Sequence, residues 1–195
     1  MMPDEGWKWA DDAVMNEMRP TRRVIGLHAL RWDGLTDLIL RARGASVFDV
    51  GCNRGHIAFD FEAHGARLCH GCDTYAAGIA AARHYFAEIP DVESKFEVVD
   101  LTGGPAAVTA AFGDMKYDIV LFIGVQHKLT RVMPERALLD LIEHLGDRAI
   151  TYLGWNGYDY DVAQMDAALA TVGLKRVHTS ELAIAGRLAA IWRRR

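Results

Sequence analysis

SVFDVGCNRG, at residues 46–55, is the segment from which the architecture of this chain can be inferred. A short apolar run ends in an acidic residue, passes through a turn with glycines, and leads into a helical pattern. A strand, a glycine turn and a helix in this order place a nucleotide-like ligand at the carboxyl end of a first parallel strand. The dinucleotide fingerprint G-x-G-x-x-G does not fit, because position 53 is Asn and the last glycine is Gly55.

The turn instead reads D-x-G-x-N-x-G, beginning at Asp49. Gly51 lets the backbone approach a ligand where a Cβ would collide, and it can adopt a positive φ. Asn53 belongs to a residue type that tolerates the left-handed region. Gly55 lets the next helix begin close to the strand, and the exposed amides at that helix start favour a negative charge. A plain strand-to-helix turn with no ligand is the alternative.

Three further apolar segments follow in the order of a doubly wound sheet. Residues 67–73 end in Asp73, residues 95–101 contain Asp100, and residues 117–125 form a fourth strand. A single acid after a strand is commonly a turn residue or a helix cap. The repetition of the pattern favours a ligand site along the carboxyl ends of these strands.

These motifs resemble those of the class I S-adenosylmethionine-dependent methyltransferases over about residues 45–155. The resemblance implies S-adenosylmethionine as the cofactor, with Asp49 near its ammonium group, Asp73 at its ribose hydroxyls and Asp100 at its adenine amino group. The remaining residues that the resemblance implies in the cofactor site are Gly51, Cys52, Asn53, Gly55, Leu101, Ile123 and Gly124.

Alternating strand and helix patterns predict an α/β fold with helices on both faces of a parallel sheet. Helices are expected at 24–42, 55–64, 75–88, 105–113, 131–145 and 161–172. A fifth strand is expected at 149–153, and strands 174–178 and 187–193 can form a C-terminal hairpin. By resemblance, we expect a three-layer, doubly wound, seven-stranded and mostly parallel sheet in the order 3-2-1-4-5-7-6, with the last strand antiparallel.

The composition is that of one globular domain, with 195 residues, 51% apolar and 25% charged. We expect residues 24–195 to form a single domain, preceded by a segment, 1–23, that could close over the site as a lid. The net charge of −4 does not favour a nucleic-acid partner. No apolar run is long enough to span a bilayer, and the acidic start lacks the features of a secretory signal. A cytoplasmic protein without a membrane partner is therefore expected, and its oligomeric state is open.

The cysteines do not predict a metal site. Cys69 and Cys72 form a C-x-x-C around His70, but a closed zinc site needs four ligands and the chain has no second such pair. The pair also falls in an apolar strand, where cysteine acts as a small apolar residue, and Cys52 lies in the turn.

By resemblance, the acceptor lies over the ends of the fourth and fifth strands. The fourth strand ends in Gly124-Val125-Gln126-His127-Lys128-Leu129. This loop has neither the Asp/Asn-Pro-Pro-Tyr/Phe sequence of amino-group methylases nor the Cys nucleophile of cytosine-5 methylases, so both reactions are disfavoured. His127 is the candidate catalytic base, because an imidazole pKa of about 6.5 suits proton removal near neutrality. It could instead pack or orient the cofactor, and Lys128 is expected to point to solvent.

Two other groups are candidates for acceptor binding. Trp155, Tyr158 and Tyr160 could form an aromatic rim that stacks on a flat acceptor, or could pack on the core around an Asn-Gly turn. The arginines at 19, 22 and 23 could bind an anionic acceptor, or form a surface cluster.

The sequence therefore predicts a methyltransferase with a small-molecule acceptor. A non-catalytic S-adenosylmethionine-binding scaffold or partner subunit is the first alternative. A nicotinamide-dependent oxidoreductase is the second, and the spacing of the turn argues against it.

Overall fold

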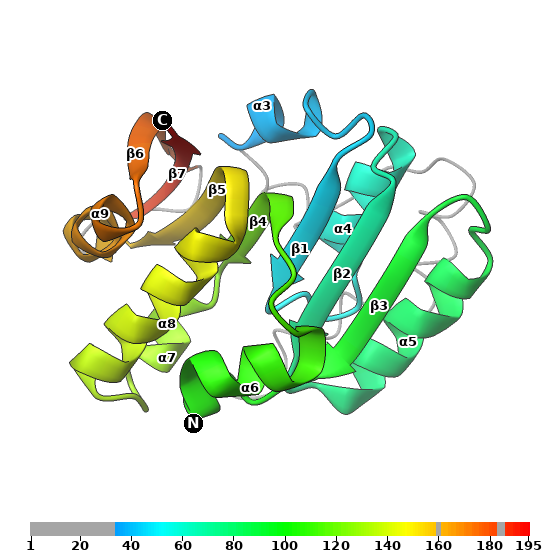
Figure 1. The fold of residues 1–195 in the computed structure, drawn as a ribbon, viewed down its shortest axis with the longest axis horizontal. Helices are drawn as coiled ribbons and strands as arrows, with labels where there is room; N and C mark the ends of the chain where they lie inside the picture. Colours follow the sequence, from blue (N-terminus) through cyan, green and yellow to red (C-terminus); the bar gives the residue numbers. More distant parts are fainter. Residues whose placement is uncertain (1–33, 159–160, 183–185) are drawn as a thin grey trace.

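A single seven-stranded sheet forms the centre of the molecule (Figure 1). The computed structural model describes residues 34–158, 161–182 and 186–195, and the strand order is β3-β2-β1-β4-β5-β7-β6. The strands are β1 (Ser46–Val50), β2 (Leu68–Asp73), β3 (Glu93–Val98), β4 (Tyr117–Ile123), β5 (Ala149–Tyr158), β6 (Leu174–Glu181) and β7 (Arg187–Arg194).

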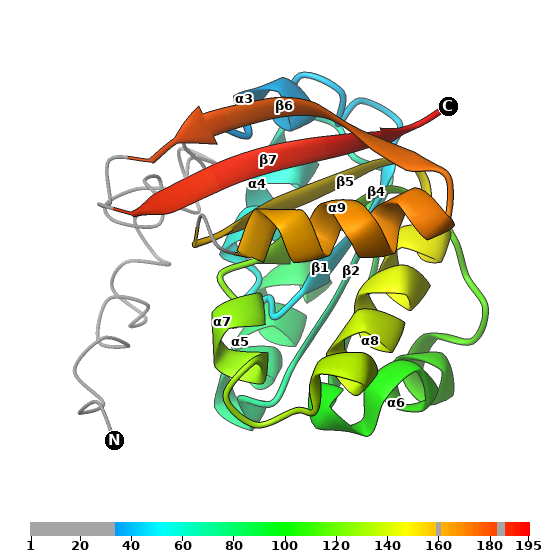
Figure 2. The same ribbon diagram turned by 90° about the vertical axis from the view of Figure 1, so that its left-hand side faces the viewer.

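The pairing of the strands confirms the expected topology. β1 to β5 pair in parallel, whereas β7 runs antiparallel to both β5 and β6. β1 is buried at every position, as a central parallel strand covered on both faces should be. β6, at the edge of the sheet, is largely exposed, and it lies beside β7 and α9 (Figure 2).

Helices cover both faces of the sheet and create two separate apolar cores. One core packs β-strand side chains against α3 (Thr36–Ile39), α4 (His56–Ala63) and α5 (Ala76–Ala87). The other uses α6 (Gly104–Phe112), α7 (Gln126–Leu129), α8 (Glu135–Arg148) and α9 (Val162–Thr171). Val47 and Phe48 enter opposite cores, because successive side chains of a strand point to opposite faces.

The helix predicted at 24–42 is wrong in its described part, where α3 covers only Thr36–Ile39. Gly34 explains why no helix runs through position 34, because its φ of 79° is incompatible with the interior of a right-handed helix. Residues 24–33 and the predicted lid at 1–23 lie outside the described residues. None of the described helices combines the length and the apolar character needed to cross a membrane.

β5 is longer than predicted, and it carries the chain past residue 153 to Tyr158. Its residues from Tyr152 onward pair with β7 in a continuous antiparallel ladder from Tyr152↔Arg193 to Tyr158↔Arg187. The Asn-Gly turn, which the sequence left open as one of two alternatives, is therefore wrong, because Asn156 and Gly157 lie within the strand. The short helix α7 was not predicted either.

Candidate functional site

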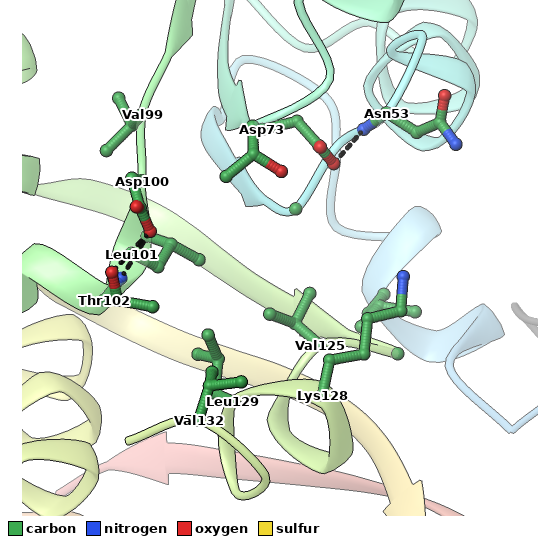
Figure 3. A pocket seen from close by; sticks show the side chains of 14 residues that line it. Asn53, Asp73, Val99, Asp100, Leu101, Thr102, Val125, Lys128, Leu129 and Val132 are labelled. Carbon is green, nitrogen blue, oxygen red and sulfur yellow. Dashed lines mark hydrogen bonds between the residues drawn. The ribbon is translucent and has the colours of Figure 1, made fainter. Parts of the chain in front are cut away.

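A pocket of about 300 Å³ lies at the carboxyl ends of the parallel strands, where the chain order reverses between β1 and β4 (Figure 3). A doubly wound sheet binds its ligand at this switch point. The pocket is lined by seven of the residues predicted for the cofactor: Gly51, Asn53, Asp73, Asp100, Leu101, Ile123 and Gly124.

The turn after β1 approaches its neighbours too closely for a side chain at Gly51. A Cβ on Gly51 would lie 2.2 Å from Cγ2 of Val125, and its φ is 83°. Asn53 also has a positive φ, 53°, and among the described residues no other non-glycine does. The turn thus has the conformation that the glycine and asparagine positions predict.

Asp73 connects this turn to the end of β2. Its Oδ2 accepts a hydrogen bond from the backbone N–H of Asn53 at 2.9 Å, and its Oδ1 accepts one from the N–H of Tyr75 at 2.9 Å. A carboxylate oxygen has a second lone pair, so both oxygens can accept a further hydrogen bond from a ligand. Asp73 is therefore both a structural link and a wall of the pocket.

Asp100 lines the pocket at the start of η2 (Leu101–Gly103), a short 3-10 helix. The backbone N–H and the hydroxyl of Thr102 both donate to its Oδ1, at 2.9 and 2.7 Å. These hydrogen bonds lower the pKa of Asp100. The carboxylate is thus kept ionised and oriented as an acceptor.

The other predicted cofactor residues, Asp49, Cys52 and Gly55, lie behind the turn and do not line the pocket. Asp49 is 1% exposed, and its Oδ2 has no hydrogen-bond partner among the described residues. Burial, and secondarily the charge of Asp73, raises the pKa of Asp49 to about 7.

Cys52 and Gly55 support the turn from within the core. Burial raises the pKa of the Cys52 thiol, so this side chain behaves as an apolar group. A Cβ on Gly55 would lie 3.2 Å from Cβ of Ala82, so glycine lets the start of α4 pack closely on α5.

The wall of the pocket opposite Asp73 comes from α7 and the residues on either side of it, a segment for which the sequence predicted a loop. Val125, Lys128, Leu129 and Val132 all line the pocket. Their i, i+3, i+4, i+7 spacing is the helical signal that could have identified this element. Lys128 is exposed, as expected, but it borders the pocket rather than open solvent alone.

A buried hydrogen-bond network holds α7 on the sheet. Gln126 is completely buried, and its Oε1 accepts from the indole Nε1–H of Trp155 at 2.8 Å. Its Nε2 donates to Oε1 of Gln164 on α9 at 2.8 Å. Because an indole only donates, this bond fixes which way the Gln126 amide points.

His127 lies on α7 beside the pocket and does not line it. Its ring packs edge-on against Tyr158, with centroids 5.5 Å apart, and the Arg187 guanidinium covers the same tyrosine at 5.0 Å. Of the two alternatives for the aromatic residues, Trp155 follows core packing and not the rim, because it is completely buried in the core. Tyr160 and the arginines at 19, 22 and 23 lie outside the described residues.

The C-x-x-C pair cannot hold one metal ion, because its two side chains point in opposite directions. Cys69 belongs to the core on the α4 side and Cys72 to the core on the α8 side. Within the described ranges, no group of three His, Cys, Asp or Glu side chains is arranged to bind a metal.

No protein-family profile and no curated protein matches the chain. Solved structures do match it. A magnesium protoporphyrin IX methyltransferase from Synechocystis with bound S-adenosylmethionine aligns with a TM-score of 0.63 at 20% identity, over 96% of this chain and 88% of that chain.

The chain has the class I methyltransferase fold. An amino pentose methyltransferase from Micromonospora echinaspora with bound S-adenosylmethionine aligns with a TM-score of 0.62 at 16% identity, over 93% of this chain and 97% of that one. The cyclase SpnF also aligns, with a TM-score of 0.60 at 15% identity, over 82% of this chain and 80% of that one. The methyltransferase fold is therefore compatible with more than one reaction, and function must be argued from the site.

Proposed function

We propose that this protein is an S-adenosylmethionine-dependent methyltransferase with a small-molecule acceptor. The observation that carries the proposal is the pocket at the switch point, where the Gly51 turn, Asp73 and Asp100 meet in the order that the resemblance requires. The proposal is supported by the methyltransferases from Synechocystis and Micromonospora echinaspora, which bind S-adenosylmethionine and have the same fold.

The residues of the pocket fit this cofactor. Near Asp100, the aliphatic side chains Leu101, Leu129 and Val132 offer apolar walls for a flat adenine ring. The absence of a Cβ at Gly51 leaves room for close approach to the backbone. The Asp49 carboxyl behind the turn, buried and with Oδ2 unpartnered among the described residues, suits a cationic group.

Each acid then has a distinct role. Asp100 accepts from the adenine amino group, while Asp73 accepts from the ribose hydroxyls through its remaining lone pairs. When bound, the cofactor supplies a methyl group activated by its positively charged sulfur. The protein's task is to align the acceptor in line with that methyl group and to exclude water.

In the proposed reaction, His127 is the base that takes a proton from the acceptor. It lies on α7, the first helix after β4, at the edge of the sheet over which the acceptor would lie, and Tyr158 packs against one side of its ring. Many nucleophiles need no base, so the contribution of His127 depends on the acceptor.

The test is a methyl-transfer assay with S-adenosylmethionine that carries an isotopically labelled methyl group. Purified protein is incubated with pools of small molecules that contain hydroxyl, amino, carboxyl and thiol groups, and label in the products is measured together with release of S-adenosylhomocysteine. Labelled product above the no-enzyme background is expected. Tight cofactor binding without labelled product from any pool would instead favour the non-catalytic binding protein.

A further inference from the structure

The charges of the pocket are unevenly distributed. Asp73 and Asp100 contribute carboxylates, and Lys128 is the one basic side chain among the described residues that line it. Asp49 adds a further carboxyl behind the Gly51 turn. An anionic group on a ligand in this pocket would therefore find its side-chain counter-charge at Lys128.

The backbone that carries Lys128 is firmly positioned. Its N–H donates to the carbonyl oxygen of Val125 at 2.9 Å. On either side of it, Gln126 is anchored through Trp155 and Leu129 is buried. The lysine thus extends a flexible stem from a fixed base, and its ammonium can adapt to a ligand without movement of α7.

Lys128 lies at the end of the pocket formed by the Gly51 turn. Val125, the residue just before α7, and Lys128 are three residues apart and both line the pocket, and Val125 packs directly against Gly51. In Figure 3, Lys128 extends toward the side of Asn53 and Asp73, whereas Leu129 and Val132 lie on the other side of Val125.

We propose that Lys128 binds the carboxylate of the cofactor's methionine moiety and thereby selects cofactors that carry it. This inference rests on the proposed function. With the adenine at Asp100, the amino-acid end of S-adenosylmethionine falls at the Gly51 turn, where Lys128 lines the pocket and Asp49 lies behind the turn. A pair of opposite charges on the protein matches the pair of opposite charges on the ligand.

The proposal differs from a general electrostatic role. A lysine that acted only through the potential of the whole site would oppose the binding of any ligand with a net positive charge, so its removal would not lower the affinity for S-adenosylmethionine. A lysine that binds the carboxylate changes affinity only for ligands that possess this group.

The experiment measures the dissociation constants of S-adenosylmethionine and decarboxylated S-adenosylmethionine, which differ only in the carboxylate. The proteins are the wild type, Lys128→Met, Lys128→Arg, and Lys175→Met as a matched control on the exposed edge strand β6. In Lys128→Met, we expect affinity for S-adenosylmethionine to fall about tenfold to a hundredfold, whereas affinity for the more cationic decarboxylated compound should not fall. Lys128→Arg should retain most of the discrimination, and Lys175→Met all of it.

Equal losses for the two compounds in Lys128→Met, or no loss for either, would overturn the proposal. So would a wild type that binds both compounds with the same affinity. If the wild type bound neither compound, the proposed function itself would fail, which is a distinguishable result. Because Lys128 is exposed, its variants should melt within a few degrees of the wild type, and this measurement verifies that they are folded.

Discussion

The backbone N–H of Asn53 and the carboxylate of Asp73, 2.9 Å apart, join the turn after β1 to the end of β2. One acid therefore fixes the shape of the glycine turn and at the same time borders the pocket that the turn creates. The conformation of the turn and the affinity for a ligand both depend on Asp73, so its replacement should lower both the stability of the protein and its affinity for the ligand.

For Asp73→Ala, we expect cofactor affinity to fall by on the order of 2 kcal/mol, because a charged acceptor for the ribose is lost. Asp73→Asn should be less destabilised than Asp73→Ala, since its amide oxygen can still accept from one of the two backbone N–H groups. Calorimetric titration and thermal melting measure the two effects. Asp91→Ala, at an exposed acid outside the pocket, is the control. If Asp73→Ala bound the cofactor with unchanged affinity, Asp73 would only stabilise the turn and would not bind the ribose.

Gly51→Ala should destabilise the protein by about 2–4 kcal/mol, through a positive φ and a collision with Val125. Gly44→Ala isolates the first effect, because Gly44 has a φ of 73° and a Cβ added there would meet no atom within 4 Å. It should cost only about 1 kcal/mol. Urea denaturation compares the two, and equal costs would show that the contact with Val125 is unimportant.

Asp49 should make the ligand-free protein less stable as the pH rises. Its pKa is raised from 3.8 to about 7 in the folded protein, so the folded state holds a proton that the unfolded state has released. Stability contributed by the protonated form is therefore lost progressively between 3.8 and about 7. Asp49→Asn mimics that form, and in urea denaturation it should stabilise the protein more at about pH 8 than at about pH 5. A pH-independent difference would contradict the raised pKa.

Gln126→Leu should destabilise the protein by about 1–3 kcal/mol, because the buried indole N–H of Trp155 loses its acceptor. Gln164→Ala removes only the outer bond of the network, at a half-buried position where water can replace the lost acceptor, and should cost less. Denaturation curves give both values. If the two variants were equally stable, the network would not be what holds α7 in place.

His127→Ala should lower turnover by about a hundredfold or more while cofactor affinity stays within about threefold, if the acceptor needs a base. His84→Ala, at an exposed position on α5, is the matched histidine control. Steady-state kinetics and calorimetric titration on the same preparations separate the two quantities. If His127→Ala turned over as fast as the wild type, His127 would not act as a catalytic base.

Features encoded by local backbone requirements could be predicted from the sequence. The positive φ values at Gly51, Asn53 and Gly55 follow from residue types that tolerate them, and Asp73 and Asp100 stand where strands end. The order of the strands follows from the resemblance, and the observed sheet agrees with it.

Features that depend on distant partners could not be predicted. The Asn156-Gly157 pair has the local signature of a turn, but its pairing with β7 about 30 residues later extends the strand instead. The choice between rim and core at Trp155 likewise depends on a distant partner, because its indole donates to Gln126 in the core. Helix α7 has only four residues, so the i, i+3, i+4, i+7 spacing around it is a weak signal by itself, and its position depends on Trp155 and Gln164.

Calorimetric titration of the purified protein with S-adenosylmethionine, S-adenosylhomocysteine and NAD tests the central claim most directly. The pocket of Gly51, Asp73 and Asp100 predicts binding of the first two compounds and no binding of NAD. Binding of NAD alone, or of none of the three, would contradict the assignment of this pocket to S-adenosylmethionine.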